Sequence, residues 1–137
     1  MMKKYLWICI LIIIVLAGLL IGFGLKRVSI SPESNGTVFF EFHDKRIQSD
    51  ISEEHMKHIT EIFNNKFLYS DYPSCGFSED LSIKIDNNTF CIASDSCGTV
   101  YLLEKDKYFR LSDDENKIIR HILISYGIDF PYSNREW

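Results

Sequence analysis

The feature that most constrains this 137-residue chain is an uncharged apolar run near its start, from Tyr5 to Leu25. The run reads YLWICILIIIVLAGLLIGFGL and as a helix would be roughly 30 Å long, which matches the hydrocarbon thickness of a bilayer. A stretch of this length without a single charge is typical of a membrane-spanning helix. We therefore expect residues 1–27 to form an N-terminal transmembrane anchor with basic flanks.

A cleaved signal peptide and a lipoprotein signal are the two alternatives to a permanent anchor. A secretory signal usually has an apolar stretch of roughly 7 to 15 residues followed by an Ala-x-Ala-like site. This run is longer and offers only Gly22-Phe23-Gly24 as a small-x-small pair, so cleavage stays open as the less favoured alternative. Val15-Leu16-Ala17-Gly18 resembles the approach to a lipidation site, but Leu19 stands where the lipidated cysteine is required.

The charges that flank the apolar run decide its expected orientation. Lys3 and Lys4 precede the run and Lys26 and Arg27 follow it, so the positive-inside count is balanced. We favour a cytoplasmic N-terminus, because the leading lysines resemble a signal-anchor and a long following domain crosses largely regardless of its own charge. The chain is then a single-pass protein of the cell membrane with an extracytoplasmic domain.

Two glycines in the run, Gly18 and Gly22, are spaced as a small-xxx-small pair. Such a pair lets two membrane helices approach closely. A weak homodimer through this helix face is therefore a further expectation, although glycine is common in membrane helices in general.

The composition changes abruptly after Arg27. Residues 28–36, VSISPESNG, contain Pro32 and several turn-forming side chains. This composition predicts a linker, long enough to hold the following domain just off the bilayer. Residues 37–137 then have the length of one ordinary domain.

The part of the chain after Arg27 is acidic. It contains all 19 acidic residues and 11 of the 15 basic ones, which leaves a formal charge of −8. Nucleic acids and anionic lipid surfaces attract Lys and Arg, so binding to nucleic acid and adsorption onto headgroups are both disfavoured. The charge favours solubility of an exported domain and, as a partner, a protein with a cationic or mixed surface.

The apolar pattern after residue 36 predicts an α+β domain, an antiparallel sheet of about five or six strands with two helices packed on it. In residues 37–43, Val38, Phe40 and Phe42 share one face by the two-residue period of a strand. Further strands are expected around Ile47 and over residues 67–69, 81–85, 89–92, 99–103 and 108–111.

Two helices are expected from their start signals. The first begins at Asp50-Ile51-Ser52-Glu53, an acid with Glu three residues on, and runs to about Asn64. The second begins at Ser112-Asp113-Asp114-Glu115, a full capping box, and ends at Gly127. Its expected apolar stripe consists of Ile118, Ile119, Ile122, Leu123 and Tyr126. In the tail that follows, three aromatic residues either fold back onto the sheet or contact a partner: Phe130, Tyr132 and Trp137.

The most patterned stretch is a strand meander over residues 74–111. A two-residue loop at Asn87-Asn88 predicts a hairpin in which Ile85 faces Phe90. The same register makes Lys84 face Cys91 and, farther along, brings the two ends of the meander together.

This register makes Cys75 and Cys97 the favoured disulfide pair and leaves Cys91 unpaired in mid-strand. A bridge requires an oxidising exterior, and reduced thiols throughout are the alternative. The two paired positions lie in a repeated tripeptide, Ser74-Cys75-Gly76 and Ser96-Cys97-Gly98.

In overall plan, residues 37–127 resemble small uncharacterised extracytoplasmic domains, membrane-anchored or secreted, of Gram-positive bacteria. The features that carry the resemblance are a strand and helix, the turn Asp95-Ser96-Cys97-Gly98-Thr99, a hairpin and a closing capped helix. The resemblance brings no activity and transfers no catalytic residue.

His55 and His58 are three residues apart on the first expected helix, with Glu54 and Glu61 nearby, which suggests a metal site. The sequence is not His-Glu-x-x-His, no third ligand is identifiable, and Lys57 lies alongside. Two ordinary histidines on the flank of an amphipathic helix are therefore the favoured interpretation.

The sequence thus predicts a membrane-anchored domain without a catalytic, metal or cofactor site. Its expected function is to bind or modulate another envelope protein as an accessory or immunity-type factor. The alternative is an extracytoplasmic enzyme or metal-dependent factor that uses His55 and His58.

Overall fold

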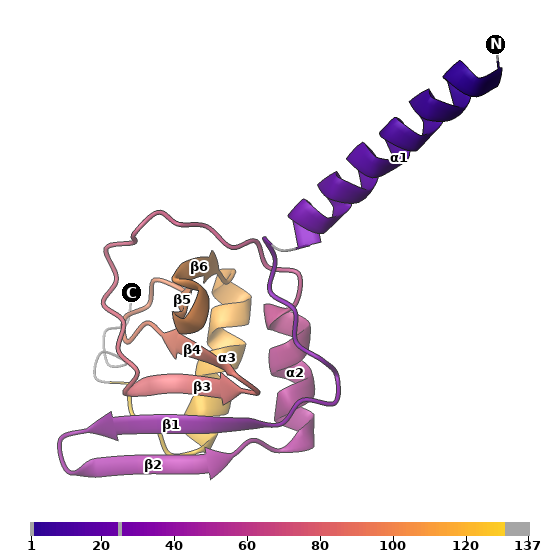
Figure 1. Ribbon diagram of the computed structural model, residues 1–137. Helices are drawn as coiled ribbons and strands as arrows, with labels where there is room; N and C mark the ends of the chain where they lie inside the picture. The colour runs from indigo at the N-terminus through magenta and orange to yellow at the C-terminus, as the bar shows by residue number, and fades with distance from the viewer. Residues whose placement is uncertain (1, 25, 131–137) are drawn as a thin grey trace.

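The computed structural model describes residues 2–24 and 26–130, and the predicted contacts of Tyr132 and Trp137 lie outside this part of the chain. A long N-terminal helix is followed by a six-stranded antiparallel sheet with two helices beside it (Figure 1). The predicted α+β fold is therefore confirmed.

The elements follow the chain in a simple order. The spatial order of the strands is β2-β1-β3-β4-β5-β6, and every neighbouring pair is antiparallel. The bounds are α1 Met2–Gly24, β1 Gly36–Phe42, β2 Lys45–Asp50, α2 Glu53–Phe63, β3 Leu81–Ile85, β4 Asn88–Ile92, β5 Thr99–Leu102, the 3-10 turn η1 Leu103–Lys105, β6 Lys107–Arg110 and α3 Asp113–Ser125.

The N-terminal helix α1 projects away from the sheet (Figure 1). Its segment Tyr5–Gly22 has a mean hydropathy of 2.9, and none of it is buried against the rest of the chain. By length and composition, α1 is able to cross a membrane. It is the one helix in the described part of the chain that meets this criterion.

The core lies between one face of the sheet and the helices α2 and α3. The ring of Phe63 from α2 packs against Phe90 and Phe109 at centroid distances of 5.1 Å each, and all three side chains are at most 1% exposed. Burying one such side chain contributes roughly 1.5–3 kcal/mol, so this aromatic contact is a main tie between α2 and the sheet.

The opposite face of the sheet is covered near β5 and β6 by the segment 66–80. Tyr101 stacks on Tyr108 at 4.8 Å, and Phe77 of the covering segment packs against both rings. Cys91 lies on this face and is only 1% exposed. Because both faces are covered here, β4 is almost entirely buried.

The predicted register of the β3–β4 hairpin is wrong by two positions. Ile83, not Ile85, faces Phe90, and Ser82 faces Cys91. The turn consists of residues 86 and 87 because Asp86 takes the left-handed conformation at φ 51°, which an aspartate accommodates better than most side chains. The shift is an even number of residues, so each side chain keeps the expected face of the sheet.

The predicted linker, residues 28–36, is packed against the domain. Val28 and Ile30 are 3% and 6% exposed and belong to the core. They alternate with Ser29 and Ser31, which are exposed. The segment is therefore extended chain with one side packed on the core, and it is not a free tether.

Several element boundaries also differ from the prediction. The first domain helix is capped by Ser52 rather than Asp50, because the Ser52 hydroxyl accepts a hydrogen bond from the backbone N–H of His55. Phe42 is 50% exposed because β1 extends past its partner β3. Ile118 is 44% exposed, at the edge of the apolar stripe of α3. The strand predicted at 67–69 is reduced to two isolated bridges.

The predicted capping box and glycine end of α3 are both confirmed. Ser112 and Glu115 bond reciprocally at its start. Gly127 has φ 86° and is followed by a bond from the N–H of Ile128 to the carbonyl of Leu123, as in a glycine C-cap. Phe130 then folds back and is 3% exposed.

Candidate functional site

A groove with a volume of about 1250 Å³ lies between α2 and residues 32–35. Its walls hold four carboxylates and one ammonium group. The charged residues that line it are Glu33, Glu53, Glu54, Lys57 and Glu61.

The groove has an apolar floor beneath its charged rim. Ile51 and Met56 line it and are among the buried residues of the core. Glu53, Glu54 and Glu61 are exposed, so their carboxylates remain hydrated. A floor of this kind accepts the aliphatic part of a side chain while the rim attracts its positive end.

One wall of the groove is held by polar contacts between distant parts of the sequence. The side-chain amide of Asn64 accepts from the N–H of Ile30 at 2.7 Å and donates to its carbonyl at 3.0 Å. The hydroxyl of Ser34 donates to Asp86 in the β3–β4 turn at 2.6 Å. These contacts hold the chain on either side of Pro32 against the end of α2 and against the β3–β4 turn.

The groove is not among the features predicted from the sequence, because the composition of residues 28–36 indicates a free linker. A signal was present in the alternation of Val28 and Ile30 with serines. That pattern is typical of a half-buried extended segment, and only its shortness and the following Pro32 concealed it.

The predicted disulfide residues lie at one end of the sheet. The Sγ atoms of Cys75 and Cys97 are paired as a disulfide, with the Cα atoms 6.7 Å apart. The backbone N–H of Cys97 donates to Asp95, and the guanidinium of Arg120 in α3 donates to the Asp95 carbonyl at 2.9 Å. The turn that carries Cys97 is thus anchored to α3.

Cys75, Asp95 and Cys97 also form the one cluster of three potential metal ligands within residues 2–24 and 26–130. The two sulfur atoms are bonded to each other, which leaves no thiolate for a metal. Cys91 is separate from this cluster, and burial, assisted by the charges of Glu79 and Glu104, raises the pKa of its thiol to about 11. A group so rarely ionised is a poor nucleophile.

His55 and His58 do not lie within a three-ligand cluster of the described chain. The Nδ1 atom of His55 lies 3.0 Å from the hydroxyl of Tyr126, which also accepts from the N–H of Ser52. This contact ties the start of α2 to the end of α3. His58 is exposed and faces a shallow groove that His121 of α3 also lines.

Comparison of the chain with models of protein families, with curated proteins and with solved structures finds no match.

Proposed function

We propose that the chain is a single-pass membrane protein whose extracytoplasmic domain binds a cationic segment of another envelope protein in the acidic groove beside α2. In this role it is an accessory or immunity-type factor that modulates its partner without chemistry of its own.

The observation that carries the proposal is the combination of an apolar floor and a negatively charged rim in the groove. Four carboxylates and a single lysine surround an apolar floor, so the groove carries a net negative charge. The formal charge of the domain as a whole is also negative. Complementary charge raises the rate of encounter and selects against acidic partners. Aliphatic stems of lysine or arginine fit the floor near Met56, while their charged ends meet the rim.

The location rests on α1 and on the cysteines. A helix with the hydropathy of Tyr5–Gly22 supports membrane anchoring. The pairing of Cys75 with Cys97 supports an oxidising compartment, and hence a domain outside the cytoplasm.

The test uses a photo-crosslinking residue in the full-length chain in intact cells. Thr60 lines the groove, and Gln48 on the outer strand β2 is an exposed control site outside it. We expect crosslinks from position 60 to a Lys- or Arg-rich segment of one protein, with a yield that falls as salt rises. Crosslinks to acidic segments, or equal yields from position 48, would contradict the proposal.

A charge reversal with a matched control sharpens the test. Glu53→Lys with Glu61→Lys should reduce the specific crosslink about tenfold, because each exposed ion pair is worth up to about 1 kcal/mol. Asp44→Lys with Asp71→Lys changes the net charge by the same amount at exposed positions outside the groove. The control pair should keep most of the yield, and an equal loss in both variants would show that only the overall charge matters.

A further inference from the structure

The chain enters the folded domain directly after α1. The N–H of Leu68 donates to the carbonyl of Lys26 at 2.8 Å, and the N–H of Val28 donates to the carbonyl of Lys66 at 2.9 Å. Between these bonds, Arg27 and Phe67 form an antiparallel bridge. The loop that follows α2 is therefore attached to the first residues after α1.

These bonds limit the distance between the domain and the bilayer. Lys26 is two residues beyond Gly24, the end of α1, and extended chain covers at most about 7 Å over two residues. Gly24 in turn lies about 3 Å beyond Gly22 along the helix. If Tyr5–Gly22 fills the hydrocarbon core, Phe67 lies near the headgroup layer, which is roughly 5–8 Å deep on each side.

The side chains at this point suit that layer. Phe67 is 54% exposed although it is large and apolar, and the guanidinium of Arg27 lies 4.0 Å from the centre of its ring. Lys26 is exposed beside them. Exposed Phe side chains of interfacial segments bury in the boundary between headgroups and acyl chains, and basic groups there lie near lipid phosphates.

We propose that Lys26, Arg27 and Phe67 form a membrane-docking edge, in which Phe67 inserts between the lipid headgroups of the membrane that α1 spans. The inference rests on the membrane anchoring proposed above and is independent of what the groove binds. The acidity of the domain disfavours adsorption of its whole surface, so the contact is confined to this edge. The domain then rests on the bilayer, instead of standing off it on a linker.

Docking at this edge orients the acidic groove. Asn64, at the end of α2, is joined to Ile30 close to the docking edge, while Glu53 lies at the other end of the helix, about 16 Å farther away. Figure 1 shows the chain running from α1 alongside α2 before it enters β1. The carboxylates at the start of α2 therefore lie on the part of the groove that is farthest from the bilayer, where a partner can reach them.

The experiment places single tryptophans in the full-length chain, reconstituted in phosphatidylcholine vesicles with bromine near the headgroup end of the acyl chains. The background carries Trp7→Phe and Trp137→Phe. Phe67→Trp is compared with Phe42→Trp, whose native phenylalanine is 50% exposed and lies at the far end of β1. We expect blue-shifted emission and loss of most fluorescence at position 67, and water-like, unquenched emission at position 42.

Equal emission and quenching at the two positions would overturn the docking edge. A variant that keeps Trp7 as its single tryptophan reports separately on α1. If Trp7 is quenched but position 67 is not, the helix is inserted and the docking proposal alone fails. If neither is quenched, the anchor itself is wrong, while binding in the groove remains testable by crosslinking. Arg27→Glu should reduce the quenching at position 67, and an unchanged signal would exclude the guanidinium from the contact.

Discussion

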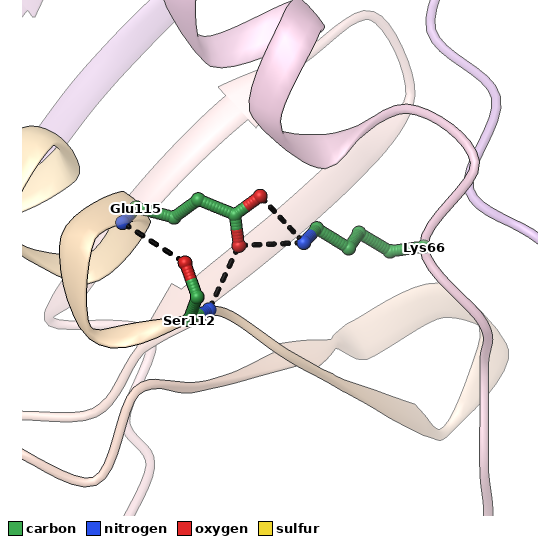
Figure 2. Close-up of polar contacts among 3 residues, drawn as sticks. All are labelled: Lys66, Ser112 and Glu115. Carbon is green, nitrogen blue, oxygen red and sulfur yellow. Dashed lines mark hydrogen bonds and ion pairs between the residues drawn. The ribbon is translucent and has the colours of Figure 1, made fainter.

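The ammonium of Lys66 and the carboxylate of Glu115 lie 2.6 Å apart and join the loop after α2 to the first turn of α3 (Figure 2). The same carboxylate accepts the N–H of Ser112 at 2.7 Å, while the Ser112 hydroxyl accepts the N–H of Glu115. The carboxylate of Glu115 thus takes part both in the capping box with Ser112 and in the ion pair with Lys66, which lies in a distant segment of the chain. Both partners are about three-quarters buried, with side-chain exposures of 24% and 28%.

Glu115→Gln should destabilise the domain by about 1–2 kcal/mol, because a hydrogen bond to a charged group is lost while the shape is kept. The measurement is urea unfolding of the full chain in detergent micelles, followed by circular dichroism. Asp114→Asn is the matched control, since this neighbour is 91% exposed and lies 3.5 Å from Lys117. The control should change stability by less than about 0.5 kcal/mol, and equal effects would refute a special role for Glu115.

The contribution of Glu115 should depend on pH. Burial acts to raise the pKa of this carboxyl, but the hydrogen bonds from Lys66 and Ser112 outweigh it and lower the pKa overall. A lowered pKa stabilises the folded state above the unfolded value, about 4.3 for glutamate, and the gain disappears as the pH falls through the folded pKa. The stability difference between the native chain and Glu115→Gln should therefore be constant near neutrality and shrink below about pH 4.

Gly36→Ala should destabilise the domain by about 1–3 kcal/mol through overpacking. A Cβ atom at this buried position would lie 2.7 Å from the sulfur of Met56 and 3.2 Å from the carbonyl of Lys84, which belongs to the backbone of β3. Gly76→Ala is the control, because nothing lies within 4 Å of the position that its new methyl group would take. Thermal unfolding compares the two variants, and a Gly36→Ala domain as stable as the control would contradict this packing.

Non-reducing peptide mapping should recover Cys75 joined to Cys97, with Cys91 free. Loss of the bridge in Cys75→Ser should cost about 3 kcal/mol on the chain-entropy estimate for a closed loop of this size. Cys91 should resist alkylation at neutral pH, because it is buried and the pKa of its thiol is raised to about 11. Recovery of a Cys75 to Cys91 bridge would refute the arrangement.

The same cysteines test the side of the membrane on which the domain lies. A membrane-impermeant thiol reagent applied to intact cells should reach Cys75 and Cys97 only after reduction. Thiols that stay unlabelled in reduced intact cells, yet react after lysis, would place the domain in the cytoplasm.

Leu16→Arg together with Leu20→Arg should release the chain from the membrane or block its insertion. A charge near the centre of the span costs roughly 3 kcal/mol on insertion scales, a charge nearer its end, as at Leu20, costs less, and both leucines are exposed on α1. Membrane fractionation measures the outcome, with Leu16→Ile and Leu20→Ile as the apolar control.

The native chain should keep its N-terminus, whereas a mature protein that begins at Leu25 would identify the run as a cleaved signal.

Much of the fold could be predicted because its signals are local. The capping box at Ser112 and the glycine end at Gly127 each depend on residues within a few positions, and the structure confirms both. The faces of the strands were predictable from alternation alone. The hairpin register was not, because it depends on the backbone conformation of Asp86, and neighbouring asparagine residues offered an equally good turn one position later.

The candidate groove depends on contacts that cannot be predicted from the sequence pattern. Ile30 meets Asn64 across 34 residues, and Ser34 meets Asp86 across 52. The composition of residues 28–36 suggested only a tether, because the same turn-forming residues occur in solvated linkers and in segments that pack against a domain. The acidic residues of α2 could be identified from the sequence, but the wall of residues 32–35 that lies beside them could not.

By itself, the sequence determined the apolar helix, the acidic charge of the domain, the helix caps and the alternation of the strands, because each follows from side chains close together along the chain. The tertiary structure alone decided the strand register, the packing of Val28 and Ile30, the groove beside α2 and the attachment of Lys26 to Leu68. These features follow from burial and hydrogen bonding between distant segments, and such contacts form only when the whole core is assembled.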